Sequence, residues 1–115
     1  MKVINASKNT VLATNALLAD SFFSRAVGLL HRKGLEADEA LILTRCQSIH
    51  MFFMRFAIDV IFADKDNRVV GLTPHIKPYQ MSPIFFKASY AVELPVGTIQ
   101  RSQTTVGDRL EIKED

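Results

Sequence analysis

The residues of this chain that could do chemistry gather between Arg45 and Arg55. Cys46, His50 and Met54 are spaced four apart, which places them on one face of either a helix or a strand. A thiolate, an imidazole and a thioether are soft ligands that suit Cu(I) better than magnesium or calcium. Yet Cys46 and Met54 would stand about 26 Å apart on a strand, at roughly 3.3 Å per residue, and about 12 Å apart on a helix, at roughly 1.5 Å per residue. At most a pair, His50 with Cys46 or with Met54, could meet one ion. The plainer interpretation is that Cys46 and Met54 are core residues and that His50 is hydrogen-bonded.

Two carboxylates stand inside runs that are otherwise typical of buried strands. Asp59 lies within the apolar run 58–62, and Glu93 alternates with the apolar residues of 90–94, so that it faces the opposite side from them. A buried carboxylate must be paired, and the candidate partners of Asp59 are Arg25, His50 and Arg55. One interpretation places both carboxylates on the wet face of a sheet. The sharper hypothesis is one polar pocket with the binding residues Arg25, His50, Met54, Asp59 and Glu93.

The same side chains allow an enzymatic alternative. Cys46 with His50 could act as nucleophile and base, and His50 with Asp59 or Glu93 could carry general acid–base catalysis in a small hydrolase. The chain has no phosphate-binding glycine loop, C-x-x-C pair, H-E-x-x-H or G-x-S-x-G motif, which excludes most well-marked enzyme classes. We therefore favour a non-enzymatic role and leave enzymatic activity open.

One segment of the chain carries a full set of helix signals. Apolar residues recur at helical spacing from Phe22 to Leu30, Asp20 or Ser21 can cap the start, and Gly34 follows a basic last turn. These signals predict one main helix over about 21–33. Short runs rich in β-branched and aromatic residues predict strands at 2–4, 10–18, 40–44, 49–54, 57–63, 68–73, 88–94 and 109–113. Residues 98–101 are expected to form a short helical turn.

Two connections stand out between these strands. The polar residues 64–67 predict a tight hairpin turn. The longer stretch Pro74–Lys87 combines three prolines with several large apolar residues, and such a loop is either a packed cover over the core or a binding element. It suggests a protein-interaction module that exposes Tyr79, Met81, Phe85 and Phe86.

One helix followed by short strands with short connections predicts an α+β fold. We expect a mainly antiparallel, curled or barrel-like β-sheet with the helix at about 21–33 packed on it, in a single domain over 1–115. From a formal net charge of +2 and the lack of an apolar run of membrane-spanning length, we expect neither nucleic acid nor a membrane as partner. The single cysteine and the absence of a signal-peptide core lead us to expect a cytoplasmic protein.

Four stretches of the chain carry a family resemblance: Arg25–Leu30, Cys46–Asp64, Glu93–Gly97 and Val106–Leu110. They resemble an uncharacterised small-domain family, number 192 among the domains of unknown function, and the likeness runs from about 12 to 112. The positions that the family motif marks are occupied here by Arg25, Gly28, His50, Met54, Asp59, Glu93, Gly97, Gly107 and Asp108. The chain departs from the family at Met51, where relatives more often have a small hydroxyl residue, and at Ala57, where proline is common. The resemblance implies a compact, mostly β domain found in bacteria and archaea, and it brings no known activity.

The sequence thus predicts a small non-enzymatic ligand- or metal-binding domain with a polar pocket around His50. Cys46 and His50 are the candidate metal ligands. The alternatives are a protein-interaction module that uses the 74–87 loop and a small hydrolase. The sequence identifies neither the ligand nor a cofactor.

Overall fold

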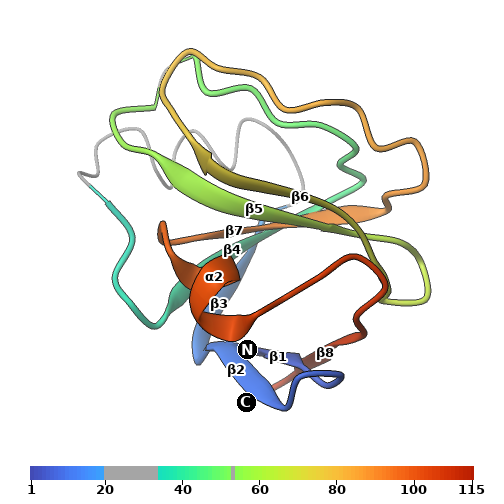
Figure 1. Ribbon diagram of the computed structural model, residues 1–115. Helices are drawn as coiled ribbons and strands as arrows, with labels where there is room; N and C mark the ends of the chain where they lie inside the picture. Colours follow the sequence, from blue (N-terminus) through green and yellow to red (C-terminus); the bar gives the residue numbers. More distant parts are fainter. Residues whose placement is uncertain (20–33, 53) are drawn as a thin grey trace.

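The computed structural model describes residues 1–19, 34–52 and 54–115, and strands dominate it (Figure 1). In chain order the elements are β1 (Lys2–Asn5), β2 (Thr10–Ala13), β3 (Asn15–Ala19), β4 (Glu39–Thr44), β5 (Ile58–Ala63), β6 (Val69–Ile76), β7 (Tyr90–Leu94), α2 (Thr98–Ser102) and β8 (Leu110–Lys113). A three-stranded sheet has the order β2-β1-β8, and a five-stranded sheet has the order β3-β4-β7-β5-β6. Strands β3 and β4 are parallel, and the other pairs are antiparallel.

This architecture confirms the α+β class and the mainly antiparallel, curled sheet. Over the described ranges the strands form two separate sheets and not a closed barrel. Helix α2 confirms the helical turn expected at 98–101. The main helix expected at about 21–33, and with it Arg25 and Gly28, lies outside the described residues. No helix in the part of the chain that the structure describes has the length and apolar character needed to cross a bilayer.

The prediction of a strand at 49–54 is wrong. Among the described residues 49–52 and 54, only His50 makes a β-bridge, to Met81 of the long loop that follows β6. The loop carries Pro78 and Pro83, which have no N–H to donate, and Tyr79 has a φ of 68°, which turns the chain. A regular ladder cannot form against such a partner, so both segments stay irregular.

The strand expected at 10–18 is in fact two strands that belong to different sheets. The N–H groups of Thr14 and Asn15 both donate to the carbonyl of Asp38, at 3.0 and 2.9 Å. These bonds hold the chain where it leaves β2 and enters β3. One continuous run of sequence therefore contributes to both sheets.

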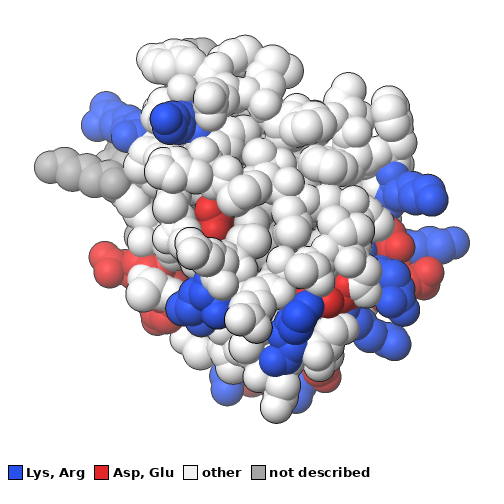
Figure 2. All heavy atoms as spheres, viewed as in Figure 1, with Lys and Arg blue, Asp and Glu red and all other residues white. Residues whose placement is uncertain are grey.

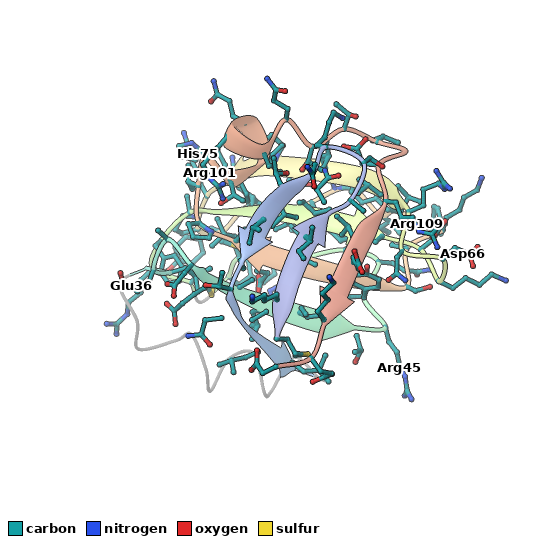
Figure 3. The ribbon with its side chains drawn as sticks, turned by 90° about the horizontal axis from the view of Figure 1, so that it is seen from below. Glu36, Arg45, Asp66, His75, Arg101 and Arg109 are labelled. Atoms are coloured by element: carbon teal, nitrogen blue, oxygen red, sulfur yellow. The ribbon has the colours of Figure 1, made fainter. Side chains whose placement is uncertain are left out.

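The five-stranded sheet separates two apolar layers. Along β5, Ile61 and Ala63 face the three-stranded sheet, whereas Val60 and Phe62 face the long loops. We call these the intersheet layer and the loop layer. Figure 1 shows the small sheet and α2 below the five-stranded sheet and the two long loops above it. Figure 3 shows the small sheet crossing the larger one as seen from below.

A buried polar network closes the lower end of the molecule. The amide of Asn5 donates to Asp108 at 3.0 Å and to Thr104 at 2.9 Å, and the ammonium of Lys8 lies 2.8 Å from the Asp108 carboxylate. Burial alone would raise the pKa of Asp108, but the hydrogen bonds from Asn5, Lys8 and Thr105 together lower it well below its usual value. The network ties β1 and the turn after it to the segment that leads into β8.

The hairpin turn predicted at 64–67 is confirmed between β5 and β6. The side chain of Asp64 accepts hydrogen bonds from the N–H groups of Arg68 and Asp66, at 3.0 and 2.9 Å. The bond from Arg68 is the main cause that lowers the pKa of Asp64. Asn67 completes the turn with a φ of 63°, a conformation that asparagine tolerates well.

Candidate functional site

Two long loops, residues 45–57 and 77–89, run side by side above the five-stranded sheet (Figure 1). At one end the N–H of Phe85 donates to the carbonyl of Gln47 at 2.8 Å. At the other end Met51 donates to Gln80 at 2.9 Å and accepts from Tyr79 at 2.8 Å. Between these ends the hydroxyl of Ser82 accepts from the N–H of Ile49 at 2.9 Å. The loops therefore form one cross-bonded unit, although neither contains a regular strand.

The underside of this unit fills the loop layer. Met51 is fully buried and Met54 is 6% exposed, and both pack with residues of β4, β5 and β7. Phe85 reaches down to Phe62 with 4.6 Å between ring centroids, and its ring lies against Gly71 so closely that a Cβ there would clash. The expectation that Phe85 is exposed is therefore wrong, since it anchors the loop to the sheet.

Glu93 belongs to the same layer. It is fully buried on β7, opposite Val60 of β5 and Leu41 of β4, and both of these face the loops. The sequence alternation placed Glu93 on the face opposite to Tyr90, Val92 and Leu94, and the structure confirms this. Glu93 and Met54 thus share one side of the sheet with the segment that carries His50.

Asp59 lies on the other side of the sheet. It is 2% exposed, and it pairs in register with Leu94, which faces the intersheet layer. Its Oδ1 accepts from the N–H of His75 at 2.8 Å, and its Oδ2 accepts from Gly97 at 3.1 Å and Ile99 at 2.9 Å. Three backbone amides thus bind the carboxylate, and among the described residues neither His50 nor Arg55 forms an ion pair with it. The structure does not bring Asp59 together with Glu93.

His50 and Cys46 lie on the first of the two loops. The half-buried imidazole stacks on Phe52, with ring centroids 5.0 Å apart and an angle of 28° between the planes. The thiol of Cys46 donates to the carbonyl of Ser48 at 3.2 Å. In residues 1–19, 34–52 and 54–115, no three His, Cys, Asp or Glu side chains gather as ligands for a metal ion. Arg25, the fifth predicted binding residue, lies outside these ranges.

The paired loops carry five large apolar side chains that are exposed. Their exposed fractions are 41% for Phe52, 74% for Tyr79, 64% for Met81, 57% for Ile84 and 78% for Phe86. We call these five residues the loop surface. Tyr79, Met81 and Phe86 were expected from the sequence to be exposed, whereas Phe52 and Ile84 were not. The alternation of Phe52 with the buried Ile49 and Met51 is the sequence signal that could have indicated its exposure.

The charged residues of the two loops all have the same sign. Arg45, Arg55, Lys77 and Lys87 are exposed, and residues 45–57 and 77–89 contain no Asp or Glu. Figure 2 shows largely uncharged atoms over the loops, with Lys and Arg at the borders of this area. Figure 3 shows Arg45 projecting away from the body of the molecule. The exposed side chains of the two loops therefore combine five large apolar groups with four cations.

Comparisons with known proteins bear out the family resemblance. Residues 3–112 match the model of the family described as DUF192, uncharacterized ACR. A UPF0127 protein of Pyrococcus furiosus is 38% identical over an alignment of 115 positions, which covers 95% of this chain and 96% of that one. A UPF0127 protein of Pyrococcus horikoshii is 35% identical over 111 residues, 94% and 96% of the two chains. A crystal structure of a protein of unknown function from Novosphingobium aromaticivorans has the same fold, with a TM-score of 0.79, 24% identity, and coverage of 96% of this chain and 82% of that one.

Proposed function

This chain belongs to the uncharacterised DUF192 family, and since membership assigns no activity, we propose a function from its own surface: a non-enzymatic binding domain that docks through the loop surface. The observation that carries the proposal is the exposure of Phe52, Tyr79, Met81, Ile84 and Phe86 on two loops that are bonded to each other. Single exposed apolar residues are ordinary, but a group of this kind is typical of an interaction site.

The backbone of Tyr79 supports this proposal. A left-handed conformation costs a residue with a side chain roughly 1–2 kcal/mol, and glycine or asparagine would tolerate it better. The Tyr79 side chain is 74% exposed, so packing within the molecule does not offset that cost. A strained residue of this kind points to a role for its side chain outside the folded chain.

The rigidity of the loops also supports a binding role. The hydrogen bonds between the two loops and the Phe85 anchor hold the backbone that carries the exposed side chains. A loop backbone that is already ordered loses less conformational entropy on binding, which improves affinity. We therefore expect the loops to keep their conformation when a partner docks.

Limited trypsin digestion in a cell extract tests this function. Lys87 on the loops and Lys65 in the β5–β6 turn are both exposed cleavage positions in the same molecule. Extract should slow cleavage after Lys87 and leave cleavage after Lys65 unchanged, compared with the same mass of serum albumin.

Two variants sharpen the test. Phe86→Ser should abolish the protection, whereas Val106→Ser, which changes a 63% exposed valine outside the loops, should preserve it. Equal digestion after Lys87 in extract and in albumin would exclude a partner among the components of the extract.

A second proposal, the binding of a small ligand around His50, draws on a different observation. Glu93 and Met54, two of the five predicted binding residues, lie on the side of the sheet that is covered by the segment carrying His50. Native mass spectrometry of protein purified without chelator tests it. A retained mass that disappears in His50→Ala would support the ligand site, and a clean apo mass in both proteins would rule it out.

A further inference from the structure

We propose that the partner of the loop surface is an anionic lipid bilayer. This inference rests on the proposed function and names what the surface binds. It concerns peripheral docking through loops, whereas the sequence-based expectation of no membrane partner concerned apolar runs of spanning length.

The charge of the loops points to a uniformly negative partner. At one end of the paired loops the N–H of Cys46 donates to the carbonyl of Ser89, and the cations Arg45 and Lys87 lie at this end. At the other end Lys77 lies two residues before Tyr79. With Arg55 these residues give four cations and no acid in residues 45–57 and 77–89. The whole chain is nearly balanced, with 14 basic and 12 acidic residues, so the bias belongs to the loops.

This bias argues against a second copy of the chain on the same surface. Two loop surfaces face to face would bring four cations against four cations, and like charges brought together across an interface are unfavourable. A bilayer rich in acidic lipids has one sign of charge over its whole surface, which complements the single sign of charge on the two loops.

The apolar residues also suit the bilayer interface. Three of the five exposed side chains are aromatic: Phe52, Tyr79 and Phe86. The other two are the thioether of Met81 and the aliphatic side chain of Ile84. Peripheral proteins bury such side chains roughly 5–10 Å into the boundary between headgroups and acyl chains, with basic residues at the headgroups. Tyr79 has the apolar ring and polar tip that favour this position.

Sedimentation with sucrose-loaded vesicles tests the inference. One set contains phosphatidylglycerol and phosphatidylcholine in equal parts, and the other contains phosphatidylcholine alone. We expect the full chain to sediment with the first set and to remain in solution with the second. Each cation near an acidic bilayer contributes about fivefold to partition, and high salt should remove most of this contribution.

Matched variants separate the charge of the loops from the charge of the molecule. Lys77→Gln with Lys87→Gln should lower partition about 25-fold, at about fivefold per cation. Lys2→Gln with Lys113→Gln, which removes two exposed cations from the small sheet, should change it far less. Phe86→Ser should also weaken sedimentation, and Val106→Ser should not.

The outcomes distinguish this inference from the proposed function. Sedimentation that is equal with both vesicle sets, or equally reduced by both pairs of lysine variants, would overturn the lipid assignment. Protection of Lys87 by extract without any vesicle binding would also overturn it and would identify a protein partner, leaving the binding function intact. Failure of both experiments would reject the binding function itself.

Discussion

At the scale of single residues, the backbone of Tyr79 destabilises the fold, whereas we propose that its exposed side chain serves binding. Its φ of 68° is unfavourable for an aromatic residue, and its exposed side chain has little packing to lose. Tyr79→Asn should therefore raise the free energy of unfolding by about 1 kcal/mol, because asparagine adopts this conformation more easily. Urea denaturation measures the change. Tyr79→Phe keeps an aromatic residue in the left-handed conformation and should leave the free energy of unfolding unchanged. If Tyr79→Asn is less stable than the wild type, the strain at Tyr79 is not the cause.

Tyr90 makes a prediction at alkaline pH. Burial, with a smaller contribution from the Asp64 charge, raises the pKa of Tyr90 to about 12, and its hydroxyl donates to Asn67 at 2.8 Å. Because the folded pKa exceeds the unfolded value of about 10, the stabilisation is complete below about pH 10 and is lost as the pH rises toward 12.

Tyrosinate absorbance can follow this titration directly. The chain has two tyrosines, so Tyr79→Phe leaves Tyr90 as the single reporter. Its titration should follow that raised pKa while the protein is folded and shift toward the ordinary value in urea. Titration near 10 in the folded state would show that the ring is not held as described.

At the scale of elements, Asp59 joins three segments that are distant in the chain. Its carboxylate binds the end of β6 through His75 and the start of α2 through Gly97 and Ile99. In Asp59→Asn one carboxylate oxygen, which accepts hydrogen bonds, is replaced by an amide NH₂ group, which donates. That NH₂ group would face a backbone N–H, so two donors would meet without an acceptor. The variant should lose about 2–3 kcal/mol of stability, measured by urea denaturation.

The same variant decides between a structural and a binding role. If Asp59 acts only as this junction, Asp59→Asn should keep the vesicle partition of the folded protein. If Asp59→Asn instead leaves the free energy of unfolding unchanged but removes a ligand that the wild-type protein retains in native mass spectrometry, the pocket hypothesis is favoured.

Asp59 and Glu93 show how far the sequence can predict such elements. Alternation along a strand correctly indicated that Glu93 faces away from Val92 and Leu94. Burial of Asp59 was likewise foreseeable, but its partners are backbone amides 16 to 40 positions away, and amides have no side-chain signature. The sequence therefore pointed to a cation as the partner of Asp59 and gave no sign of the three amides that bind it.

The 49–54 segment shows a different limit. Its buried Ile49 and Met51 alternate as in a strand, yet its partner contains two prolines and the turned Tyr79. Hydrophobic alternation reports which side chains are buried, and it does not report whether a partner strand exists.

At the scale of the whole molecule, the Asp108 network links both ends of the chain. The hydrogen bonds from Asn5 and Lys8 lower the pKa of Asp108, so the network stabilises the fold above the unfolded value of about 4 and weakens as the pH falls below it. Asp108→Asn should cost about 2 kcal/mol at neutral pH. Denaturation curves at several pH values should show this difference shrinking in acid, and a constant difference would contradict it.

The topology of the five-stranded sheet also has a consequence for the order of events during synthesis. Strand β7 lies between β4 and β5, although it follows both in the chain, and β8 completes the small sheet beside β1. A nascent chain that has emerged only as far as β6 has a β5–β6 hairpin but no connection from it to β4. Neither sheet can therefore be completed before the last quarter of the chain has been synthesised. Until then the β5–β6 hairpin on the ribosome remains without its β7 neighbour. Once release allows β7 to insert, folding is expected to be nearly all-or-none.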